Sequence, residues 1–345
     1  MKLYLTSKSY LKCSIVNQIL KDLKLYNLFE LNPYTTYGTP EQPIDTTLVC
    51  CNKRIEFIEL NSKEESYFLS IENGLEKGMN DQYVDICYVV LKTKEKEYIN
   101  KSQSVFVKST WLDQAKAETP FNYEHIDLGL STTIGEIINR ENSNIPKDDW
   151  MSFYGLKRID QIMPPLRKCF IDWQKDQLQK NITFYENFPK PGVIYQDMSY
   201  ILNNKIQLRF LINCMADLVL NKFGKIDQIA GLDSRGFIYG SLLASEIDSG
   251  FVMIRKKGKL PGETVTTGYE TEYSSDNFEM LKNVIKKNDR VLVIDDLVAT
   301  GGSLLAATKL INEVEGDVIG SFTILKVDPL FEIASNKIKN LITLF

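Results

Sequence analysis

Two adjacent acids, Asp295 and Asp296, follow four apolar residues in the segment VLVIDDLVATGGSLLAA, residues 291–307. Such an apolar run is typical of a buried strand, so the two carboxylates are expected at its carboxyl end. The residues that come next and open a helix-compatible stretch are Ala299, Thr300, Gly301, Gly302 and Ser303. Glycines let the backbone approach an anion closely, and the free amides of a helix start point toward it. This pattern predicts a phosphate cradle beside a carboxylate pair that can accept hydrogen bonds from sugar hydroxyls.

The alternative interpretation is a plain strand–turn–helix in which the glycines only make the turn and the acids lie at a solvated edge. Two acids at a buried strand end, followed at once by Thr-Gly-Gly-Ser, favour the anion site instead. The segment is not a Walker phosphate loop, because it lacks the Gly-Lys-Ser/Thr ending of that loop.

Two further segments place positive charge after apolar runs. The turn D-S-R-G, residues 233–236, follows a strand-like run and carries the guanidinium of Arg235. Residues 255–262 hold two glycines and a proline among Arg255, Lys256, Lys257 and Lys259. Taken alone, the first segment is also compatible with an ordinary turn and the second with a solvated basic loop.

The elements that must position these residues alternate along the chain from Ile182 onward. Strands are expected at 226–232, 251–255, 290–296 and 318–327, and helices at 236–247, 277–287 and 302–314. This alternation is typical of an α/β domain with a parallel sheet covered by helices on both faces. Ligands of such sheets bind at the carboxyl ends of the strands.

With these elements in place, residues 291–307 resemble the motif of type I phosphoribosyltransferases that binds phosphoribosyl pyrophosphate (PRPP). Other segments narrow the resemblance to adenine phosphoribosyltransferases: FPKPGVIYQD (188–197), GLDSRGFIYG (231–240), RKKGKLPGET (255–264) and YETEY (269–273). The resemblance covers residues 182–327. It implies a purine salvage transferase, a parallel sheet flanked by helices with a lid loop, and formation of AMP and pyrophosphate from adenine and PRPP.

The resemblance also implies a role for individual residues. PRPP would be bound by Asp295, Asp296, Ala299, Thr300, Gly301, Gly302, Ser303, Arg255, Lys256, Asp233 and Ser234. Arg235 and Lys259 would supply positive charge to the leaving pyrophosphate, under a lid that excludes water. Glu272, in the same lid, would exchange a proton with a ring nitrogen of the purine, and Tyr273 would help to close the site. A non-proline cis peptide bond is implied near Asp233-Ser234.

The base pocket implied by the resemblance consists of Ile194, Tyr195, Gln196 and Val327. A backbone group would read the purine edge, the Tyr195 ring would stack on one face, and Val327 would cover the other. Tyr195 as an ordinary core residue is the alternative. Mg²⁺ is implied as the cofactor, carried mostly by PRPP and water with Asp295 and Asp296 nearby.

Two departures from the adenine enzymes bear on the choice of base. Gln196 stands where the family usually has arginine, and Lys326 lies at the end of the strand 318–327. In 6-oxopurine phosphoribosyltransferases a lysine near that position donates a hydrogen bond to the purine oxygen. Adenine is therefore the first expectation and a 6-oxopurine the alternative. A PRPP-sensing regulator without catalysis is a further alternative, against which the lid and Glu272 argue.

Residues 1–175 carry a second set of motifs, before the domain at 176–345. Strands at 83–92 and 104–110 are expected to pair, and residues 71–74 are expected to end a strand and carry Glu72 into a turn. TPEQPID (39–45), SIENGLE (70–76) and TTIGEIINRENS (132–143) together resemble the inosine/xanthosine triphosphatase family. That resemblance implies an α/β nucleotide-triphosphatase-like domain, with Glu72 as a metal ligand and Lys8 or Lys12 on the phosphates.

This first domain departs from its family in two places. The start reads Thr6-Ser7-Lys8 rather than a Thr-Asn-x-x-Lys-like sequence, and residues 46–52 replace an expected acidic segment and Gly-Ala helix. An active enzyme and a retained fold with a weakened site both remain open. A helix at 163–181, which begins near Pro164-Pro165, is expected to close this domain and lead into a linker.

Composition narrows the partners and the compartment. The formal net charge of −4 gives no electrostatic footprint for nucleic acid or an anionic membrane. No apolar run reaches the roughly 20 residues of a membrane helix, and the start lacks a signal-peptide core, so a cytoplasmic protein is expected. The six cysteines are expected as buried free thiols, and the single histidine, His125, is assigned no role. The resemblance implies a homodimer.

Overall fold

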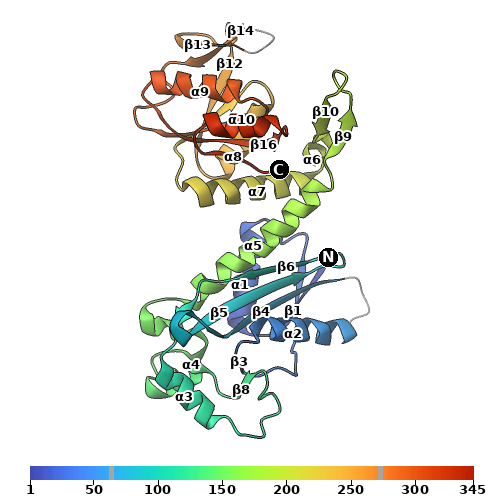
Figure 1. The fold of residues 1–345 in the computed structure, drawn as a ribbon, viewed down its shortest axis with the longest axis vertical. Coiled ribbons are helices and arrows are strands. Elements are labelled where there is room, and N and C mark those ends of the chain that lie inside the picture. Colours follow the sequence, from blue (N-terminus) through green and yellow to red (C-terminus); the bar gives the residue numbers. More distant parts are fainter. Residues whose placement is uncertain (62–65, 271–274) are drawn as a thin grey trace. The chain divides into compact units, whose positions relative to one another are not determined.

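The computed structural model describes residues 1–61, 66–270 and 275–345. The chain forms two compact units, Met1–Trp173 and Gln174–Phe345 (Figure 1). The boundary falls inside helix α5 (Arg158–Gln179), which also contains the boundary expected from the sequence at residue 175. Pro164 and Pro165 lie inside this helix, so it begins earlier than the predicted start at 163.

A seven-stranded sheet forms the centre of the second unit, in the order β13-β14-β12-β11-β15-β16-β17. Its parallel strands are β11 (Gln228–Leu232), β12 (Gly250–Lys256), β15 (Arg290–Val298), β16 (Asp317–Lys326) and β17 (Leu341–Thr343). At one edge, β13 (Thr264–Glu270) and β14 (Ser275–Leu281) pair antiparallel and extend from β12. The helices are α6 (Ser199–Asn203), α7 (Lys205–Phe223), α8 (Arg235–Glu246), α9 (Gly302–Glu313) and α10 (Leu330–Lys337). The predicted α/β fold of this half, with a largely parallel sheet, is confirmed.

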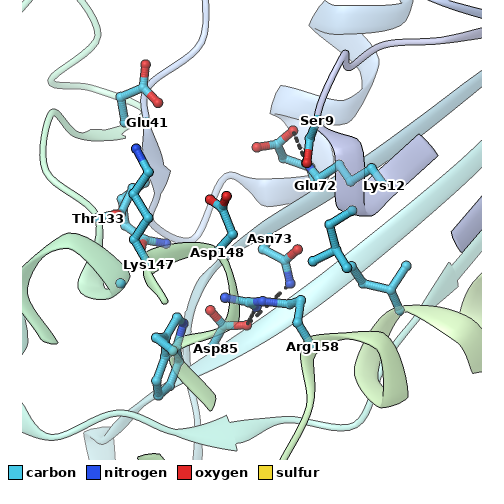
Figure 2. A pocket seen from close by; sticks show the side chains of 15 residues that line it. Ser9, Lys12, Glu41, Glu72, Asn73, Asp85, Thr133, Lys147, Asp148 and Arg158 are labelled. Carbon is cyan, nitrogen blue, oxygen red and sulfur yellow. Dashed lines mark hydrogen bonds and ion pairs between the residues drawn. The ribbon is translucent and has the colours of Figure 1, made fainter. Parts of the chain in front are cut away.

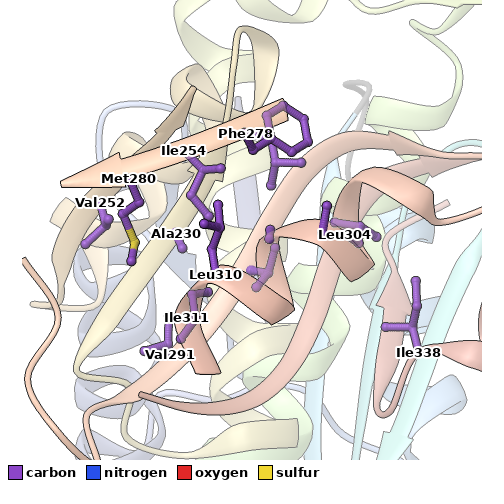
Figure 3. Packing of buried hydrophobic residues seen from close by; sticks show 14 of the residues in the cluster. Ala230, Val252, Ile254, Phe278, Met280, Val291, Leu304, Leu310, Ile311 and Ile338 are labelled. Atoms are coloured by element: carbon purple, nitrogen blue, oxygen red, sulfur yellow. The ribbon is translucent and has the colours of Figure 1, made fainter. Parts of the chain in front are cut away.

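Helices cover both faces of this sheet because its strands are apolar on both sides. On one face, Leu304 and Leu310 of α9 and Ile338 after α10 pack with Ala230 and Val291 of the sheet (Figure 3). On the other face, Gly240 of α8 lies so close to Ile294 of β15 that a Cβ there would come within 2.9 Å of Cγ2. The two helical layers exclude water from the parallel strands.

The helix predicted at 277–287 is wrong, because this segment contains β14 and a turn. Phe278 and Met280 alternate inward and pack beside Ile254 (Figure 3), while the residue between them, Glu279, turns to the other side. Pairing with β13 and β12 satisfies the backbone of the segment and imposes a period of two in place of the helical period. The strand pairing is non-local, and the local sequence N-F-E-M-L-K is compatible with either period.

The chain order reverses between two neighbouring strands of this sheet. From β11 the chain passes through α8 to β12 on one side, and from β15 it passes through α9 to β16 on the other. The connections therefore diverge at the carboxyl ends of β11 and β15, and ligands of α/β sheets bind at such a point. A separate antiparallel hairpin, β9 (Thr183–Glu186) and β10 (Ile194–Asp197), precedes these elements.

The first unit has a sheet in the order β2-β1-β4-β5-β6, with β7 paired to β5. The strands are β1 (Lys2–Leu5), β2 (Glu30–Pro33), β4 (Tyr67–Lys77), β5 (Tyr83–Lys92), β6 (Glu97–Lys101) and β7 (Val105–Phe106), and β3 (Gln42–Pro43) pairs with β8 (Gly129–Leu130). The helices besides α5 are α1 (Tyr10–Asp22), α2 (Thr47–Asn61), α3 (Ser109–Glu118), α4 (Ile134–Glu141) and the 3-10 segments Met79–Asp81 and Lys147–Tyr154. The expected pairing of 83–92 with 104–110 is confirmed, although only two residues of the second segment form a strand.

The expected turn at residues 71–74 is wrong. The strand β4 runs without a break from Tyr67 to Lys77, and its pairs with β5 include Glu72 with Tyr88 and Gly74 with Ile86. Because the pairing with β5 continues before and after Glu72 along the chain, Glu72 lies in the middle of a buried strand. Its side chain is only 7% exposed.

All six cysteines are free; five are buried and Cys13, on α1, is partly exposed. The expectation of buried thiols is therefore confirmed with one exception. Among the helices of the described ranges, none combines the length and the apolar character that a bilayer crossing requires.

Candidate functional site

The two acids of β15 and the start of α9 lie at the carboxyl end of the parallel sheet, as the sequence predicts. Helix α9 begins at Gly302, directly after Gly301 in the left-handed conformation at φ 82°. A Cβ at Gly301 would also lie 2.6 Å from Cδ1 of Ile338, so both backbone and packing demand glycine. Thr300, Ser303 and the first turn of α9, whose backbone amides have no partner within the helix, thus follow directly on the strand end that carries Asp295 and Asp296, an arrangement that can bind an anion.

Arg235 links the turn after β11 to the acid pair after β15. Its Nε lies 2.9 Å from Oδ2 of Asp296, and its Nη1 donates to the Tyr195 hydroxyl at 3.3 Å. The Arg235 side chain is 51% exposed, so a ligand can still reach the guanidinium. Tyr195 is half-buried and packs edge-on against Phe188, which places it at the rim of the site and not in the core.

Burial raises the pKa of Asp295 well above the usual aspartate range, and the neighbouring charge of Asp296 raises it further. The Asp296 amide donates to Asp295 Oδ1 at 2.9 Å, which opposes this shift without reversing it. A carboxylate that burial makes costly to ionise is stabilised by a cation or a hydroxyl donor beside it, because such a partner compensates the buried charge.

A second ion pair ties the basic segment to the turn after β11. Arg255 at the end of β12 donates from Nε to Asp233 Oδ2 at 3.1 Å, and its guanidinium lies over the Phe237 ring. The Asp233–Ser234 peptide bond is cis, as the resemblance implies. The carboxyl ends of β11 and β12 are thus joined beside Arg235.

Residues 257–262, here called the basic turn, follow β12. Lys257 and Lys259 of this turn are exposed to solvent, as is Lys256 at the end of the strand. The backbone of the basic turn is held by a residue that the sequence did not single out, Glu279 of β14. Both the Lys259 and the Leu260 amides donate to Glu279 Oε1, each at 2.7 Å. Burial alone would raise the pKa of Glu279, but the hydrogen bonds from the turn amides outweigh burial and lower it.

The predicted base-binding residues approach the same end of the sheet. Gln196 of β10 donates from Nε2 to the Lys326 carbonyl at 2.9 Å, and the Val327 amide donates to the Val298 carbonyl at 2.9 Å. These bonds place the Ile194–Gln196 segment beside the ends of β15 and β16. Ile194 itself is 61% exposed.

The Lys326 side chain is engaged next to its own strand end. Its Nζ lies 3.6 Å from Asp328 Oδ1 and 5.2 Å from the centre of the Phe331 ring. The ammonium charge therefore has an acidic partner and an aromatic face already. Glu272 and Tyr273, the expected proton-exchanging and closing residues, lie outside the described residues.

The C-terminal unit is similar to known phosphoribosyltransferases. Residues 198–329 match the family model described as "Phosphoribosyl transferase domain". The adenine phosphoribosyltransferase of Brachyspira hyodysenteriae is 40% identical over 154 residues, which are 45% of this chain and 89% of that protein. That of Clostridium botulinum is 42% identical over 152 residues, which are 44% of this chain and 87% of the relative. A solved adenine phosphoribosyltransferase of Saccharomyces cerevisiae, complexed with an imino-altritol bisphosphate and adenine, is 36% identical and covers 50% of this chain and 99% of its own, with a TM-score of 0.48.

The fold and the family match over residues 198–329 define the C-terminal half as a phosphoribosyltransferase domain. More narrowly, the chain belongs to the adenine phosphoribosyltransferase family, whose members are pentosyl-transferring enzymes.

The first unit has a pocket of its own, with a volume of about 140 Å³ (Figure 2). It lies between the starts of α1 and α4 and the middle of β4 and β5. The charged residues that line it are Lys12, Glu41, Glu72, Asp85, Lys147, Asp148 and Arg158. Lys12, one of the two candidate phosphate-binding lysines, is among them; Lys8 is not.

Glu72 is already paired within this pocket. Its Oε2 lies 2.8 Å from Arg54 Nε and 3.8 Å from Lys12 Nζ. Asp85, which is 1% exposed, accepts hydrogen bonds at 2.9 Å from both Arg158 Nη1 and Gln161 Nε2. Neither arginine was expected, since their acidic partners lie distant in the sequence. Within residues 1–61, 66–270 and 275–345, no group of three or more His, Cys, Asp or Glu side chains is arranged to hold a metal ion.

Proposed function

We propose that the C-terminal unit transfers the phosphoribosyl group of PRPP to adenine and so forms AMP and pyrophosphate. The observation that carries the proposal is the convergence of the acid pair, the Thr300–Ser303 cradle, Arg235 and the Tyr195–Gln196 segment at one end of one sheet. In this reaction the bond from the ribose C1′ to the pyrophosphate oxygen breaks, and C1′ bonds to a ring nitrogen of the purine. The pyrophosphate leaves with the electron pair of the broken bond.

Each part of the site has a place in that reaction. The cradle at the start of α9 binds the 5′-phosphate or another anionic group of PRPP through amides and hydroxyls. Asp295 and Asp296 accept hydrogen bonds from the ribose hydroxyls and face the positive charge that develops on the sugar. Arg235 and the basic turn stabilise the leaving pyrophosphate. Glu272 exchanges a proton with the purine, as the family resemblance implies.

A bound Mg²⁺ would neutralise negative charge on the pyrophosphate. The described residues offer two adjacent carboxylates at the cradle but no cluster of three or more metal-ligating side chains. Such a donor set fits a cation that is held mainly by oxygens of PRPP and by water, with Asp295 and Asp296 close to it.

Adenine is favoured over a 6-oxopurine by the position of Lys326. A lysine that reads a purine oxygen must direct its ammonium at the base, whereas this one is engaged by Asp328 and the Phe331 ring. We expect AMP from adenine and PRPP, measured by separating the products after incubation with Mg²⁺ and each base in turn. Consumption of hypoxanthine or guanine without consumption of adenine would overturn the base assignment.

Catalysis, as opposed to PRPP sensing, is tested at Glu272. Glutamine keeps the shape of the side chain and loses the proton exchange, so Glu272→Gln should lower kcat by about two to four powers of ten with near-normal substrate KM. The matched control is Glu263→Gln, since Glu263 is an exposed glutamate of the neighbouring segment. Equal kcat in both variants would leave Glu272 without a catalytic role.

For the first unit, we infer a nucleotide-triphosphatase-like domain whose hydrolysis is slow. The pairing of Glu72 with Arg54 and Lys12 supports this, because a carboxylate held by two cations is a poor ligand for a divalent metal. Full-length protein with Mg²⁺ and inosine or xanthosine triphosphate should show slow hydrolysis that Glu72→Ala abolishes, whereas Glu30→Ala, at an exposed site on β2, should leave it unchanged. Fast hydrolysis that survives Glu72→Ala would place the chemistry elsewhere.

A further inference from the structure

Both backbone polar groups of Lys259, in the basic turn of the second unit, form hydrogen bonds with charged side chains. The Lys259 carbonyl accepts a hydrogen bond from Arg255 Nη1 at 3.2 Å, and the Lys259 amide donates to Glu279 at 2.7 Å. Arg255 is itself bound to Asp233. A continuous chain of bonds therefore runs from the turn after β11, through Lys259, to a carboxylate on β14.

Glu279 is an unusual residue for its place. It lies on the central strand of the β13-β14-β12 edge and is 3% exposed, opposite Arg255 on one side and Thr266 on the other. A buried carboxylate is costly unless its charge is compensated. Here two backbone amides of the turn provide the compensation, each at a short 2.7 Å. The strand can therefore keep this acid buried only while the turn lies folded over it.

We propose that Glu279 is a positioning residue for the leaving pyrophosphate: it holds the turn so that the Lys259 ammonium faces the carboxyl ends of β11 and β15. The proposal rests on the proposed function for the purpose of the turn, though not for its geometry. Glu279 takes up the amides of Lys259 and Leu260, so the turn offers its lysine side chains, and not these amides, to an anion. Other parts of the basic turn are not packed against neighbouring atoms. Gly258 and Gly262 both have positive φ, and a Cβ added at either would have no atom within 4 Å.

The first test compares Glu279→Gln with Glu263→Gln, which alters an exposed glutamate of the same segment. The amide oxygen of glutamine carries less negative charge than a carboxylate oxygen, so it accepts the hydrogen bonds from the two backbone amides less strongly. The KM for PRPP should rise about tenfold in Glu279→Gln, with the KM for adenine unchanged, and neither should change in the control. An unchanged KM for PRPP in a folded Glu279→Gln protein would overturn the proposal.

A double-mutant cycle separates positioning from general stability. If Glu279 acts through Lys259, the KM for PRPP of Lys259→Ala should not rise further when Glu279→Gln is added. Fully additive effects would show that Glu279 acts independently of Lys259 and would reject the proposal. If Glu279→Gln does not fold, Glu279→Asp takes its place, because it keeps the charge and shortens its reach.

How firmly the basic turn is held can be measured without an activity assay. Trypsin cleaves after lysine, so cleavage after Lys257 and Lys259 in the ligand-free protein should be faster in Glu279→Gln than in Glu263→Gln. A wild-type protein that makes no AMP would refute the proposed function and leave this measurement intact. Equal cleavage rates in the two variants would refute the role of Glu279 whatever the enzyme activity.

Discussion

At the scale of single residues, the chemistry of the C-terminal site depends on charges held close together. Asp296 is paired with Arg235, Asp233 with Arg255, and Glu279 with turn amides. The acids of the VLVIDD segment and the arginine of D-S-R-G were predictable because each stands in a local pattern with few other uses. Glu279 was not, because its partners are backbone amides nineteen and twenty residues away, and sequence types do not record such bonds.

Asp295 makes the ligand-free protein sensitive to pH. Its folded pKa lies above its unfolded value, so the stability that its protonated form provides is present below about pH 4 and declines as the pH rises toward the folded pKa. Asparagine cannot ionise. The melting temperature of ligand-free wild type should therefore fall relative to that of Asp295→Asn between about pH 5 and pH 8.

The control for this experiment is Asp317→Asn, at an exposed position of β16. Its melting temperature should follow that of wild type across the same range. Parallel curves for wild type and Asp295→Asn would contradict the proposed burial of the Asp295 charge. The same Asp295→Asn protein should bind PRPP more weakly by about 1.5 to 3 kcal/mol, as expected for one lost charge-assisted hydrogen bond.

At the scale of elements, the parallel strands and α8 and α9 were predictable because each has a long apolar or amphipathic pattern of its own. Two errors have a common cause. Residues 277–287 and 71–74 were assigned from local sequence, whereas their structure is decided by antiparallel partners elsewhere in the chain. Pairing with β5 extends β4 through Glu72, and pairing with β13 and β12 draws Phe278 and Met280 inward.

The join between β15 and α9 should tolerate only glycine at position 301. Alanine would have to adopt φ 82° and place its Cβ 2.6 Å from Ile338 Cδ1. Gly301→Ala should lower the free energy of unfolding by about 2 to 4 kcal/mol, measured by urea denaturation.

Gly192→Ala is the matched control, because Gly192 has φ 81° with no atom within 4 Å of the added carbon. It should lose only the conformational part, about 1 to 2 kcal/mol. Combining Gly301→Ala with Ile338→Val should recover part of the loss. Equal losses for the two glycine variants would show that contact with Ile338 has no energetic weight.

At the scale of the whole molecule, two units with separate cores share one uninterrupted helix. The C-terminal unit begins at Gln174, within α5, and not at a flexible linker. Gln174 accepts a hydrogen bond from Asn213 Nδ2 at 2.7 Å, and both side chains are buried. The proline pair and the polar run predict a junction in this part of the chain, but they do not show that the helix continues through it.

The length of this helical extension should decide the stability of the isolated enzyme unit. Residues 174–345 should fold and make AMP with kcat near that of the full chain. Residues 180–345 lack the bond between Gln174 and Asn213 and should be less stable by about 1 to 3 kcal/mol. Thermal unfolding and AMP formation of the two fragments measure this, and identical melting temperatures would contradict it.

The distribution of thiols gives the protein a built-in site for a chemical label. Five cysteines are buried, and Cys13 alone is partly exposed, next in sequence to Lys12 of the N-terminal pocket. Burial raises the pKa of the Cys13 thiol, so its reaction with a maleimide dye should be slow at neutral pH and faster in mild alkali. A single fluorophore could thus be attached to helix α1 of the native chain without any substitution.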